Sequence, residues 1–418
     1  MIKMKKVQSF FTKLLLVMAV ISICLNGLGM FAKVHADTAA FQMDARAAYA
    51  IDAESGQVLY QKNATKRYPI ASVIKILTLG VILQDIRNHH LKWDQKIKIT
   101  PAVAKMADDW HFSNVPLVDG EEYTVRQLVD SMMLVSADGS TEALALADAG
   151  STAAFNKKMM AFAKKAGVTD IKIYNMIGLP NGDLGEHKLK GVDKDAENLL
   201  SAKDVALISK YLVEQYPETL DITKQKFANF DVTKDQQYLM TNVNALLPQN
   251  GFAPKNGEID GLKTGNTDRA GKCIVSTGTF AGRRIILVAL HTKGEWNDQS
   301  KMQQDFYNKL VDEYQPVEIK KVSDLSAKLT SVKVKNGKNK NKANIKLTKK
   351  TTVWLPKDMK LQATKPTLRV QENDQKQLTA PVKKNQQVGS IKLHIPGLPD
   401  FNIPVSASQS VAKKSMFY

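Results

Sequence analysis

The sequence predicts an α+β fold, in which helices pack against an antiparallel sheet and a small all-β domain follows. Three observations lead to this prediction. Strand-like segments lie at residues 46–61 and 273–290, whereas the segments between them have helical periodicity. Beyond Pro316 the helical pattern gives way to short alternating strands. A body with strands at both ends and helices between them places its terminal strands in one sheet.

Two hairpins define the strands expected in this body. Residues 46–53 and 57–61 are apolar or alternating and flank a turn at residues 54–56. Residues 273–280 and 284–290 are apolar throughout, which is typical of buried strands in a sheet. We therefore expect an antiparallel sheet whose centre contains the second hairpin.

The helices are expected between these hairpins. Residues 70–83 are apolar on all sides, with Ser72, Lys75 and Thr78 as their main polar side chains, which is the pattern of a buried helix. Thr124 is expected to cap the helix that follows it. Helices are therefore predicted at residues 70–83, 125–135, 142–149, 153–166, 202–216 and 299–313, the last returning along the sheet.

The chain of 418 residues is long enough for two or three domains. A lysine-rich start, an apolar stretch and the small-residue site at Ala36 predict a secretory signal peptide over residues 1–36, with an uncleaved anchor as the alternative. The expected product is exported and lies in the cell wall or on the outer face of the cytoplasmic membrane. We expect a main domain at 37–315, a basic β domain at 316–406 and a polar tail at 407–418.

The net charge of +18 is concentrated near the C-terminus. Residues 316–418 carry 21 basic and 6 acidic side chains, whereas residues 37–315 sum to −2. Such a charge attracts polyanions. The basic segment has few aromatic side chains for stacking on bases, so nucleic acid is not the expected partner. With export, the charge predicts weak, salt-sensitive association with anionic cell-wall polymers or with the membrane surface.

Cysteine and histidine usage indicates neither disulfides nor metal. Cys273 is the only cysteine beyond the signal peptide, so no intrachain disulfide is expected, and its apolar surroundings indicate a packing role. The chain lacks the clustered Cys and His of zinc sites. No metal and no cofactor are predicted, and the histidines form no hydrolase triad that can be assigned.

Ser72 and Lys75 are the first candidates for chemistry. Three residues apart on a helix, their side chains share one face. Burial disfavours the cationic form of lysine, so Lys75 can serve as a base toward the adjacent hydroxyl. The pattern is weak alone, because Ser410 and Lys413 repeat it in the polar tail. The alternative is that Lys75 has no catalytic role and only extends its ammonium to solvent.

Two further segments follow this pair in order, Ser136-Ala137-Asp138 and Lys263-Thr264-Gly265. The three segments resemble the Ser-x-x-Lys, Ser-x-Asn and Lys-Thr/Ser-Gly motifs of the penicillin-binding and serine β-lactamase superfamily. The resemblance is closest to the low-molecular-mass D-alanyl-D-alanine carboxypeptidases, the peptidase S11 type. It covers nearly the whole mature chain, including the appended β domain.

The resemblance implies a β-lactamase/transpeptidase-like body and a serine-type carboxypeptidase. Such an enzyme removes the terminal D-alanine from peptidoglycan stem pentapeptides and binds penicillin covalently. By resemblance, Ser72 is the nucleophile, Lys75 its base and Ser136 the relay of a proton to the leaving amine.

The third motif implies the substrate-binding residues. Lys263 and Thr264, on an edge strand, suit the terminal carboxylate of the substrate, and Gly265 allows its backbone to approach closely. The backbone N–H groups of Ser72 and Asn266 are expected to form the oxyanion hole.

Asp138 departs from the family pattern, which has Asn at this place. A carboxylate only accepts hydrogen bonds, and near Lys75 it favours the ammonium form. We therefore hypothesise a reduced or pH-shifted acylation; the alternative is that Asp138 accepts a hydrogen bond from Lys75 at little cost. A second departure is Lys293, which stands where the family often carries arginine. We interpret it as a solvated loop residue.

Two rival functions remain at this point. A β-lactamase is disfavoured because residues 175–200 lack the motif Glu-x-x-Leu-Asn and because of the extra β domain. A non-catalytic penicillin-binding cell-wall protein, with its site weakened at Asp138, is the rival from another class.

Overall fold

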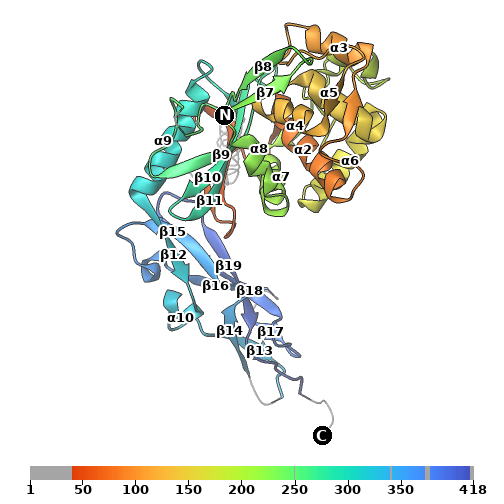
Figure 1. Ribbon diagram of the computed structural model, residues 1–418. Helices are drawn as coiled ribbons and strands as arrows, with labels where there is room; N and C mark the ends of the chain where they lie inside the picture. Colours follow the sequence, from red (N-terminus) through yellow and green to blue (C-terminus); the bar gives the residue numbers. More distant parts are fainter. Residues whose placement is uncertain (1–39, 249, 339–340, 372–376, 415–418) are drawn as a thin grey trace, which may run out of the picture. The chain divides into compact units, whose positions relative to one another are not determined.

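A computed structural model describes residues 40–248, 250–338, 341–371 and 377–414 (Figure 1). The expected signal peptide at residues 1–36 lies outside this range. From Phe41 onward the chain forms one compact unit. The boundary expected near residue 315 therefore stays a prediction.

The body is built on a five-stranded antiparallel sheet, which confirms the predicted α+β class. Its strand order is β2-β1-β11-β10-β9, so strands from both ends of the body lie side by side. Tyr49 on β1 pairs with Val288 on β11, which also pairs with Val275 on β10. The strands are β1 (Ala45–Asp52), β2 (Val58–Lys62), β9 (Gly257–Gly265), β10 (Lys272–Phe280) and β11 (Arg283–Thr292).

Helices surround this sheet, as Figure 1 shows. Helix α9 packs on β10 and β11, as expected for the returning helix, and α7 packs on β1 and β11. Thr124 caps α4 as predicted, and Gln127 completes a capping box by accepting from the Thr124 backbone. The α-helices of the body are α2 (Lys75–Arg87), α3 (Pro101–Asp108), α4 (Val125–Leu134), α5 (Asp138–Ala149), α6 (Thr152–Lys165), α7 (Ala202–Gln215), α8 (Glu218–Thr223) and α9 (Asp298–Glu313).

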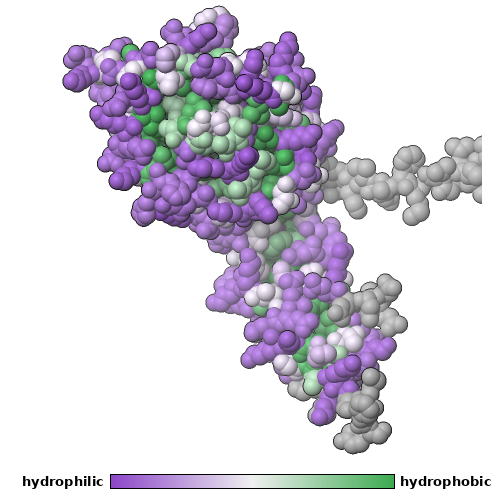
Figure 2. Space-filling view, turned by 90° about the vertical axis from the view of Figure 1, so that its right-hand side faces the viewer, coloured by the Kyte–Doolittle hydropathy of each residue, from purple (hydrophilic) through white to green (hydrophobic). Residues whose placement is uncertain are grey.

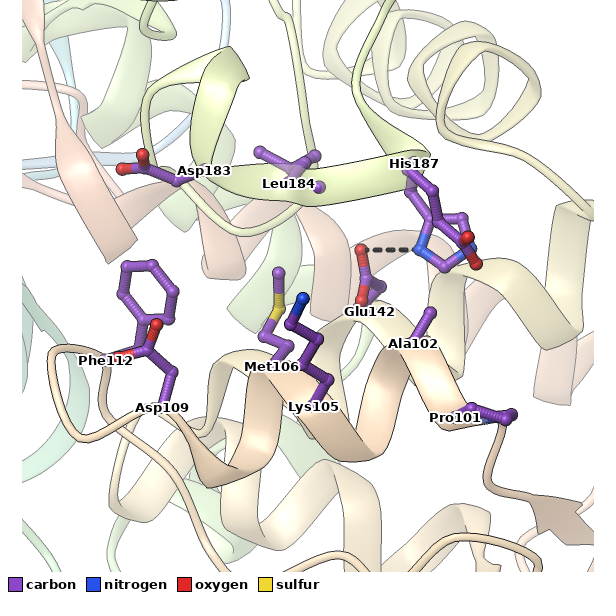
Figure 3. Close-up of a pocket in the computed structure, with 12 residues that line it drawn as sticks. Pro101, Ala102, Lys105, Met106, Asp109, Phe112, Glu142, Asp183, Leu184 and His187 are labelled. Atoms are coloured by element: carbon purple, nitrogen blue, oxygen red, sulfur yellow. Dashed lines mark ion pairs between the residues drawn. The ribbon is translucent and has the colours of Figure 1, made fainter.

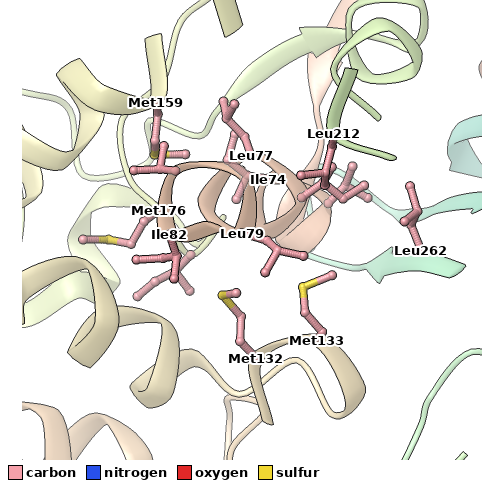
Figure 4. Close-up of a cluster of buried hydrophobic side chains, with 14 of the residues drawn as sticks. Ile74, Leu77, Leu79, Ile82, Met132, Met133, Met159, Met176, Leu212 and Leu262 are labelled. Atoms are coloured by element: carbon pink, nitrogen blue, oxygen red, sulfur yellow. The ribbon is translucent and has the colours of Figure 1, made fainter. Parts of the chain in front are cut away.

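Helix α2 lies in the middle of the hydrophobic core. Leu77, Leu79 and Ile82 point in different directions from it and are each at most 1% exposed. Methionines of α4 and α6, together with Leu212 and Leu262, surround the helix (Figure 4). This confirms the buried helix predicted from its all-round apolar pattern. The predicted range is only partly right, because residues 71–74 form a separate 3-10 turn, η1 (Ala71–Ile74).

Three small two-stranded antiparallel sheets and two 3-10 turns lie among these helices. The sheets pair β3 with β6, β4 with β5 and β7 with β8; the last pair is a hairpin, whereas helices separate the partner strands of the first two along the chain. Their bounds are β3 (Arg67–Pro69), β4 (Lys96–Lys98), β5 (Glu122–Thr124), β6 (Leu199–Ser201), β7 (Phe227–Asp231) and β8 (Gln237–Thr241). Downstream of residue 175 the chain forms the 3-10 turn η2 (Asn181–His187).

The C-terminal region is rich in strands. One antiparallel pair joins β12 (Tyr314–Ile319) to β15 (Thr351–Pro356), and a six-stranded sheet has the order β16-β18-β19-β14-β13-β17. Two short helical turns, α10 (Val322–Leu325) and η3 (Leu361–Thr364), correct the expectation of strands alone. The remaining strands are β13 (Ser331–Lys335), β14 (Lys342–Leu347), β16 (Thr367–Val370), β17 (Leu378–Thr379), β18 (Gln387–Leu393) and β19 (Phe401–Ala407).

Lysines gather on one side of two of these strands. Lys333 on β13 lies directly opposite Lys342 on β14. Because alternate residues of a strand share one face, Lys335 lies on the same face as Lys333, and Lys346 on the same face as Lys342. All four are exposed. The surface seen in Figure 2 is largely hydrophilic in this region. Among the described residues, no helix combines the length and apolarity needed to span a membrane.

Candidate active site

Ser72 lies in the tight turn that precedes α2. It is half-buried in η1, and Lys75 is the first residue of α2. The Lys75 Nζ donates to Ser72 Oγ over 3.0 Å, as the three-residue spacing predicts. The preceding residue, Ala71, has φ of 49°, a left-handed conformation that is strained for a side chain with a Cβ. The hydroxyl is thus presented by an unusual turn rather than by the regular helix.

The Lys75 amine also connects Ser72 to the second motif. Its Nζ donates to the carbonyl oxygen of Ser136 over 3.0 Å and to Ser136 Oγ over 3.2 Å. A short hydrogen bond, which is also an ion pair, joins it to Asp138 at the start of α5. Two hydroxyls, one backbone carbonyl and one carboxylate therefore converge on one nitrogen, which is itself fully buried.

Burial controls the charge of this group. It lowers the pKa of Lys75, while the Asp138 carboxylate acts in the opposite direction by attracting the ammonium form. Burial likewise raises the pKa of Asp138, against the attraction of Lys75. The low-dielectric surroundings thus bring the proton affinities of the two groups closer together.

The third motif lies on β9, an edge strand of the main sheet. Lys263 is 2% exposed and donates from Nζ to the backbone carbonyl of Thr264 over 2.9 Å. Burial, followed by repulsion from Lys75, holds the pKa of Lys263 well below its ordinary value. The amino group of Lys263 is covered by protein, while Thr264 lines the open cleft.

Gly265 has a role that the sequence did not reveal. A Cβ at this position would lie 2.9 Å from the backbone nitrogens of Ser72 and Val73, so strand β9 and turn η1 can approach only with glycine here. Gly178 is crowded in the same way, since its Cβ would lie 2.2 Å from the carbonyl oxygen of Ala71. Both glycines press against the turn that carries Ser72.

These groups open into a cleft of about 280 Å³. Most of the predicted site residues line it: Ser72, Ser136, Asp138, Thr264, Gly265 and Asn266. Lys75 and Lys263 lie behind its wall.

The cleft also has walls that the motifs did not indicate. Phe112, Val243 and Trp296 line it, together with Leu179 and His111. They come from loops distant in sequence, and an aromatic residue in a loop is too common a pattern to have identified them.

The remaining predictions concern residues outside the cleft. Cys273 is fully buried, and burial raises the pKa of its thiol to about 12, which agrees with a packing role. The Lys293 ammonium is 3.3 Å from Asp44, and both side chains are more than 70% exposed, which agrees with a solvated loop. Among the described residues, no three His, Cys, Asp or Glu side chains are grouped to hold a metal ion.

Comparison with known proteins gives a consistent family. Residues 32–294 match the family model described as D-alanyl-D-alanine carboxypeptidase. DacF of Bacillus subtilis, a D-alanyl-D-alanine carboxypeptidase, is 26% identical over 88% of this chain and 86% of its own length. DacC of Escherichia coli, also a D-alanyl-D-alanine carboxypeptidase, is 29% identical over 90% of this chain and 86% of its own length.

Solved structures agree with the fold. The peptidoglycan synthesis regulatory factor PBP3 from Streptococcus pneumoniae matches with a TM-score of 0.65 and 26% identity, over 89% of this chain and 100% of that one. Penicillin-binding protein D2 from Listeria monocytogenes, in its cefotaxime-bound form, matches with a TM-score of 0.52 and 28% identity. This match covers 65% of this chain and 98% of that one. From the match of the family model and these relatives, the chain is a member of the D-alanyl-D-alanine carboxypeptidase family.

Proposed function

We propose that this carboxypeptidase removes the terminal D-alanine from peptidoglycan stem pentapeptides through an acyl-enzyme at Ser72. The observation that supports this most is the position of Lys75 Nζ, 3.0 Å from Ser72 Oγ and 3.2 Å from Ser136 Oγ. A neutral amine at this point can take the proton of the nucleophile and pass it toward the leaving group.

Acylation proceeds in two stages. Ser72 Oγ forms a bond to the carbonyl carbon between the two D-alanines, and its proton passes to Lys75 Nζ. The negative charge on the carbonyl oxygen is stabilised by the backbone N–H groups of Ser72 and Asn266. The C–N bond then breaks, and the nitrogen of the departing D-alanine receives the proton from Lys75 through Ser136 Oγ.

Deacylation uses the same groups in reverse. Water attacks the ester carbonyl and gives its proton to Lys75, and Ser72 recovers a proton as the shortened peptide leaves. The terminal carboxylate of the substrate is held by the Thr264 hydroxyl and by the charge of Lys263. Because a nearby anion favours the ammonium form, the arriving carboxylate restores the positive charge that burial disfavours on Lys263.

β-Lactams are proposed to acylate the same serine. Penicillin-binding protein D2 from Listeria monocytogenes is known in cefotaxime-bound and ampicillin-bound forms, which supports this proposal by similarity. The ring amide then takes the place of the D-alanine peptide bond.

Fluorescent penicillin tests the nucleophile. We expect a long-lived adduct with the wild type and none with Ser72→Ala, since this substitution removes the hydroxyl that lies 3.0 Å from Lys75 Nζ at the start of α2. Ser410→Ala, which alters the second Ser-x-x-Lys pattern, is the matched control and should label normally. An adduct retained in Ser72→Ala would contradict the assignment.

The same experiment separates the rivals. Rapid loss of the adduct would indicate a β-lactamase, and absence of any adduct in the wild type would indicate a non-catalytic protein. Release of D-alanine from a D-Ala-D-Ala peptide then completes the test of the carboxypeptidase assignment.

We further propose that the protein is exported and that residues 316–406 form a basic domain that binds anionic cell-wall polymers or the membrane surface. The charge of residues 316–418 and the face of Lys333, Lys335, Lys342 and Lys346 support this proposal. Like charges directly opposite each other on a sheet weaken it, and an anion bound across them relieves the repulsion.

Sedimentation with cell-wall fragments tests this binding. We expect retention at low ionic strength that is lost as salt is raised, and a loss of retention when the four lysines become glutamine. Four exposed lysines of the body, Lys92, Lys96, Lys234 and Lys301, changed to glutamine are the control. Retention that is insensitive to salt would contradict an electrostatic mechanism.

A further inference from the structure

Two buried glutamates of the body lie outside the three motifs, and the catalytic steps described above use neither. Glu142 faces a cavity between α3 and η2, where its Oε1 lies 3.1 Å from Nδ1 of His187 (Figure 3). That carboxylate is thus paired within the helical region. Glu197 is 3% exposed, and its carboxylate contacts the loop between β9 and β10, which contains Asn266.

Glu197 holds this loop through the side chain of Thr267. The Thr267 hydroxyl donates to Glu197 Oε2 over 2.8 Å and accepts from the Ala270 backbone N–H over 3.0 Å. The Gly271 N–H closes the turn by donating to the Thr267 carbonyl oxygen over 2.8 Å. The carboxylate is therefore bonded to the residue that organises the whole turn.

The same two segments of the chain meet at a second point. The Arg269 guanidinium donates to the backbone carbonyl of Asp195, and its Nε lies 4.0 Å from Glu197 Oε1. Burial raises the pKa of Glu197, while the hydrogen bond from Thr267 and the charge of Arg269 oppose this shift. Burying a carboxyl group is costly unless it is hydrogen-bonded, so the bond from Thr267 fixes the positions of both side chains.

Asn266 lies between two fixed neighbours. Gly265 on one side is held against η1, since a Cβ there would lie 2.9 Å from the Ser72 nitrogen. Thr267 on the other side is held by Glu197. The Asn266 side chain is itself exposed in the cleft. The position of the Asn266 backbone N–H therefore depends on its two neighbours and not on packing of its own side chain.

The segment that contains Glu197 also supports the turn that carries Ser72. Leu199, two residues beyond Glu197, pairs with Pro69 in the small sheet of β3 and β6. Pro69 lies three residues before Ser72. The carboxylate therefore links the loop of Asn266 to a strand that leads directly into η1.

Asn198 adds a second support for this turn. Its Oδ1 accepts from the Asn175 N–H over 3.2 Å, and its Nδ2 donates to the Asn175 carbonyl oxygen over 2.9 Å. The Asn175 side chain in turn accepts from the Gly178 N–H over 2.7 Å, and Gly178 is the residue that presses against Ala71. Residues 197–199 thus connect to both the loop of β9 and the turn of the nucleophile.

We propose that Glu197 is a positioning residue for acyl transfer, which sets the position of the Asn266 N–H relative to the Ser72 N–H. The inference rests on the proposed function, in which these two donors stabilise the anionic carbonyl oxygen. Such sites are sensitive, because a misplacement of about 1 Å can lower the rate by a factor of about 10². Glu197 does not line the cleft, so it acts on the rate of acylation and not on binding.

Four variants test the hydrogen bond between Glu197 and Thr267. Glu197→Ala and Thr267→Val should lower the rate constant of penicillin acylation about tenfold, and should leave the dissociation constant of the preceding non-covalent complex within about twofold. Glu197→Gln and Thr267→Ser keep an acceptor and a donor, so acylation should stay within about threefold of the wild type. The double variant Glu197→Ala with Thr267→Val should be no slower than either alone, because both remove the same bond. Stopped-flow acylation at increasing penicillin concentration measures both constants.

A boronic acid tests the oxyanion hole itself. In an acetylated D-alanine analogue whose scissile carbonyl is replaced by a boronic acid, boron bonds to Ser72 Oγ while the hydroxyl proton passes to Lys75, which leaves a tetrahedral anion. Only this anion requires the oxyanion hole, so its affinity should fall about tenfold in Glu197→Ala and should be restored in Glu197→Gln.

Thr152→Val is the matched control, since Thr152 is also buried and its hydroxyl donates to the His187 carbonyl oxygen over 2.6 Å. It should lower the urea midpoint and leave acylation unchanged. Wild-type acylation in Glu197→Ala, acylation in Glu197→Gln as slow as in Glu197→Ala, or an unchanged affinity for the boronic acid would each overturn the inference. Failure of the proposed function shows separately, as absence of a penicillin adduct in the wild type.

Discussion

The contact between Asp138 and Lys75 sets the chemistry at the scale of single residues. A base must be free of its proton before it can accept one from Ser72. Burial favours the neutral amine, while the adjacent carboxylate favours the ammonium. The hypothesis of a pH-shifted acylation is therefore consistent with the geometry, and so is the alternative of a hydrogen bond that costs little.

Asp138→Asn separates these two readings. Removing the carboxylate removes an attraction that holds a proton on Lys75, so the neutral amine should persist to lower pH. We expect penicillin acylation at the acid end of the pH profile to be roughly tenfold faster, since a hydrogen bond to a charged group is worth about 1.5–3 kcal/mol. Stopped-flow acylation rates between pH 5 and 9 measure this.

The control for this variant is Asp130→Asn on α4, a half-buried carboxyl whose pKa burial raises to about 6. It should leave the acylation profile in place. If Asp138→Asn acylates at the wild-type rate across the whole range, the carboxylate does not govern the base.

Glu142 makes stability depend on pH. Burial raises its pKa from 4.5 to about 7, although His187 opposes this shift. The folded protein thus retains a proton that the unfolded chain releases near pH 4.5, so the free energy of unfolding falls as pH rises through this window. In Glu142→Gln this fall, roughly 3 kcal/mol, should disappear. Urea unfolding at pH 5 and pH 8 measures the difference.

The control is Glu258→Gln, which removes an exposed carboxyl that does not act on Glu142 and should keep the wild-type dependence on pH. A Glu142→Gln protein that loses as much stability as the wild type between these pH values would show that the buried carboxyl is not responsible.

At the scale of elements, the sequence predicts which helices and strands form better than it predicts the residues at which they begin. The two hairpins, α7 and α9 follow from apolar patterns that local physics makes reliable. The predicted helix at 70–83 is wrong in its first turn, because η1 is bent by contacts with β9 and with Gly178. These contacts come from residues more than a hundred positions away and leave no periodic signal.

The site shows the same division. The proximity of Ser72, Lys75 and Ser136 could be predicted, because their spacing and order form a recognisable set of motifs. Phe112, Val243 and Trp296 were missed, because loops bring them to the cleft and no pattern connects them. At Gly265 the sequence predicts close approach of the substrate, and the structure adds a second requirement, because a Cβ would have no room beside η1.

At the scale of the whole molecule, a buried polar cluster joins the main sheet to β15. Asp52 on β1 is fully buried and receives hydrogen bonds from Arg283 Nε over 2.9 Å and from Trp354 Nε1 over 2.9 Å. Gln57 exchanges two further hydrogen bonds with the Trp354 backbone. Burial alone would raise the pKa of Asp52, but these donors outweigh it and hold the pKa below its ordinary value.

Arg283→Met tests this cluster. It leaves the Asp52 carboxylate buried without its cation, which should cost about 3–5 kcal/mol of the free energy of unfolding. Lys293→Met, which removes a cation from the exposed pair with Asp44, should cost less than about 1 kcal/mol. Urea midpoints compare the two, and equal midpoints would show that the cluster adds no stability.

The enclosure of Lys75 has a practical consequence for chemical labelling. The lysines on the surface are open to reagents that attack amines, whereas the Lys75 nitrogen has no exposed surface and is occupied by four hydrogen-bond acceptors. Dyes or crosslinkers can therefore be attached densely to this protein while the Lys75 amine, the proposed base, stays unmodified.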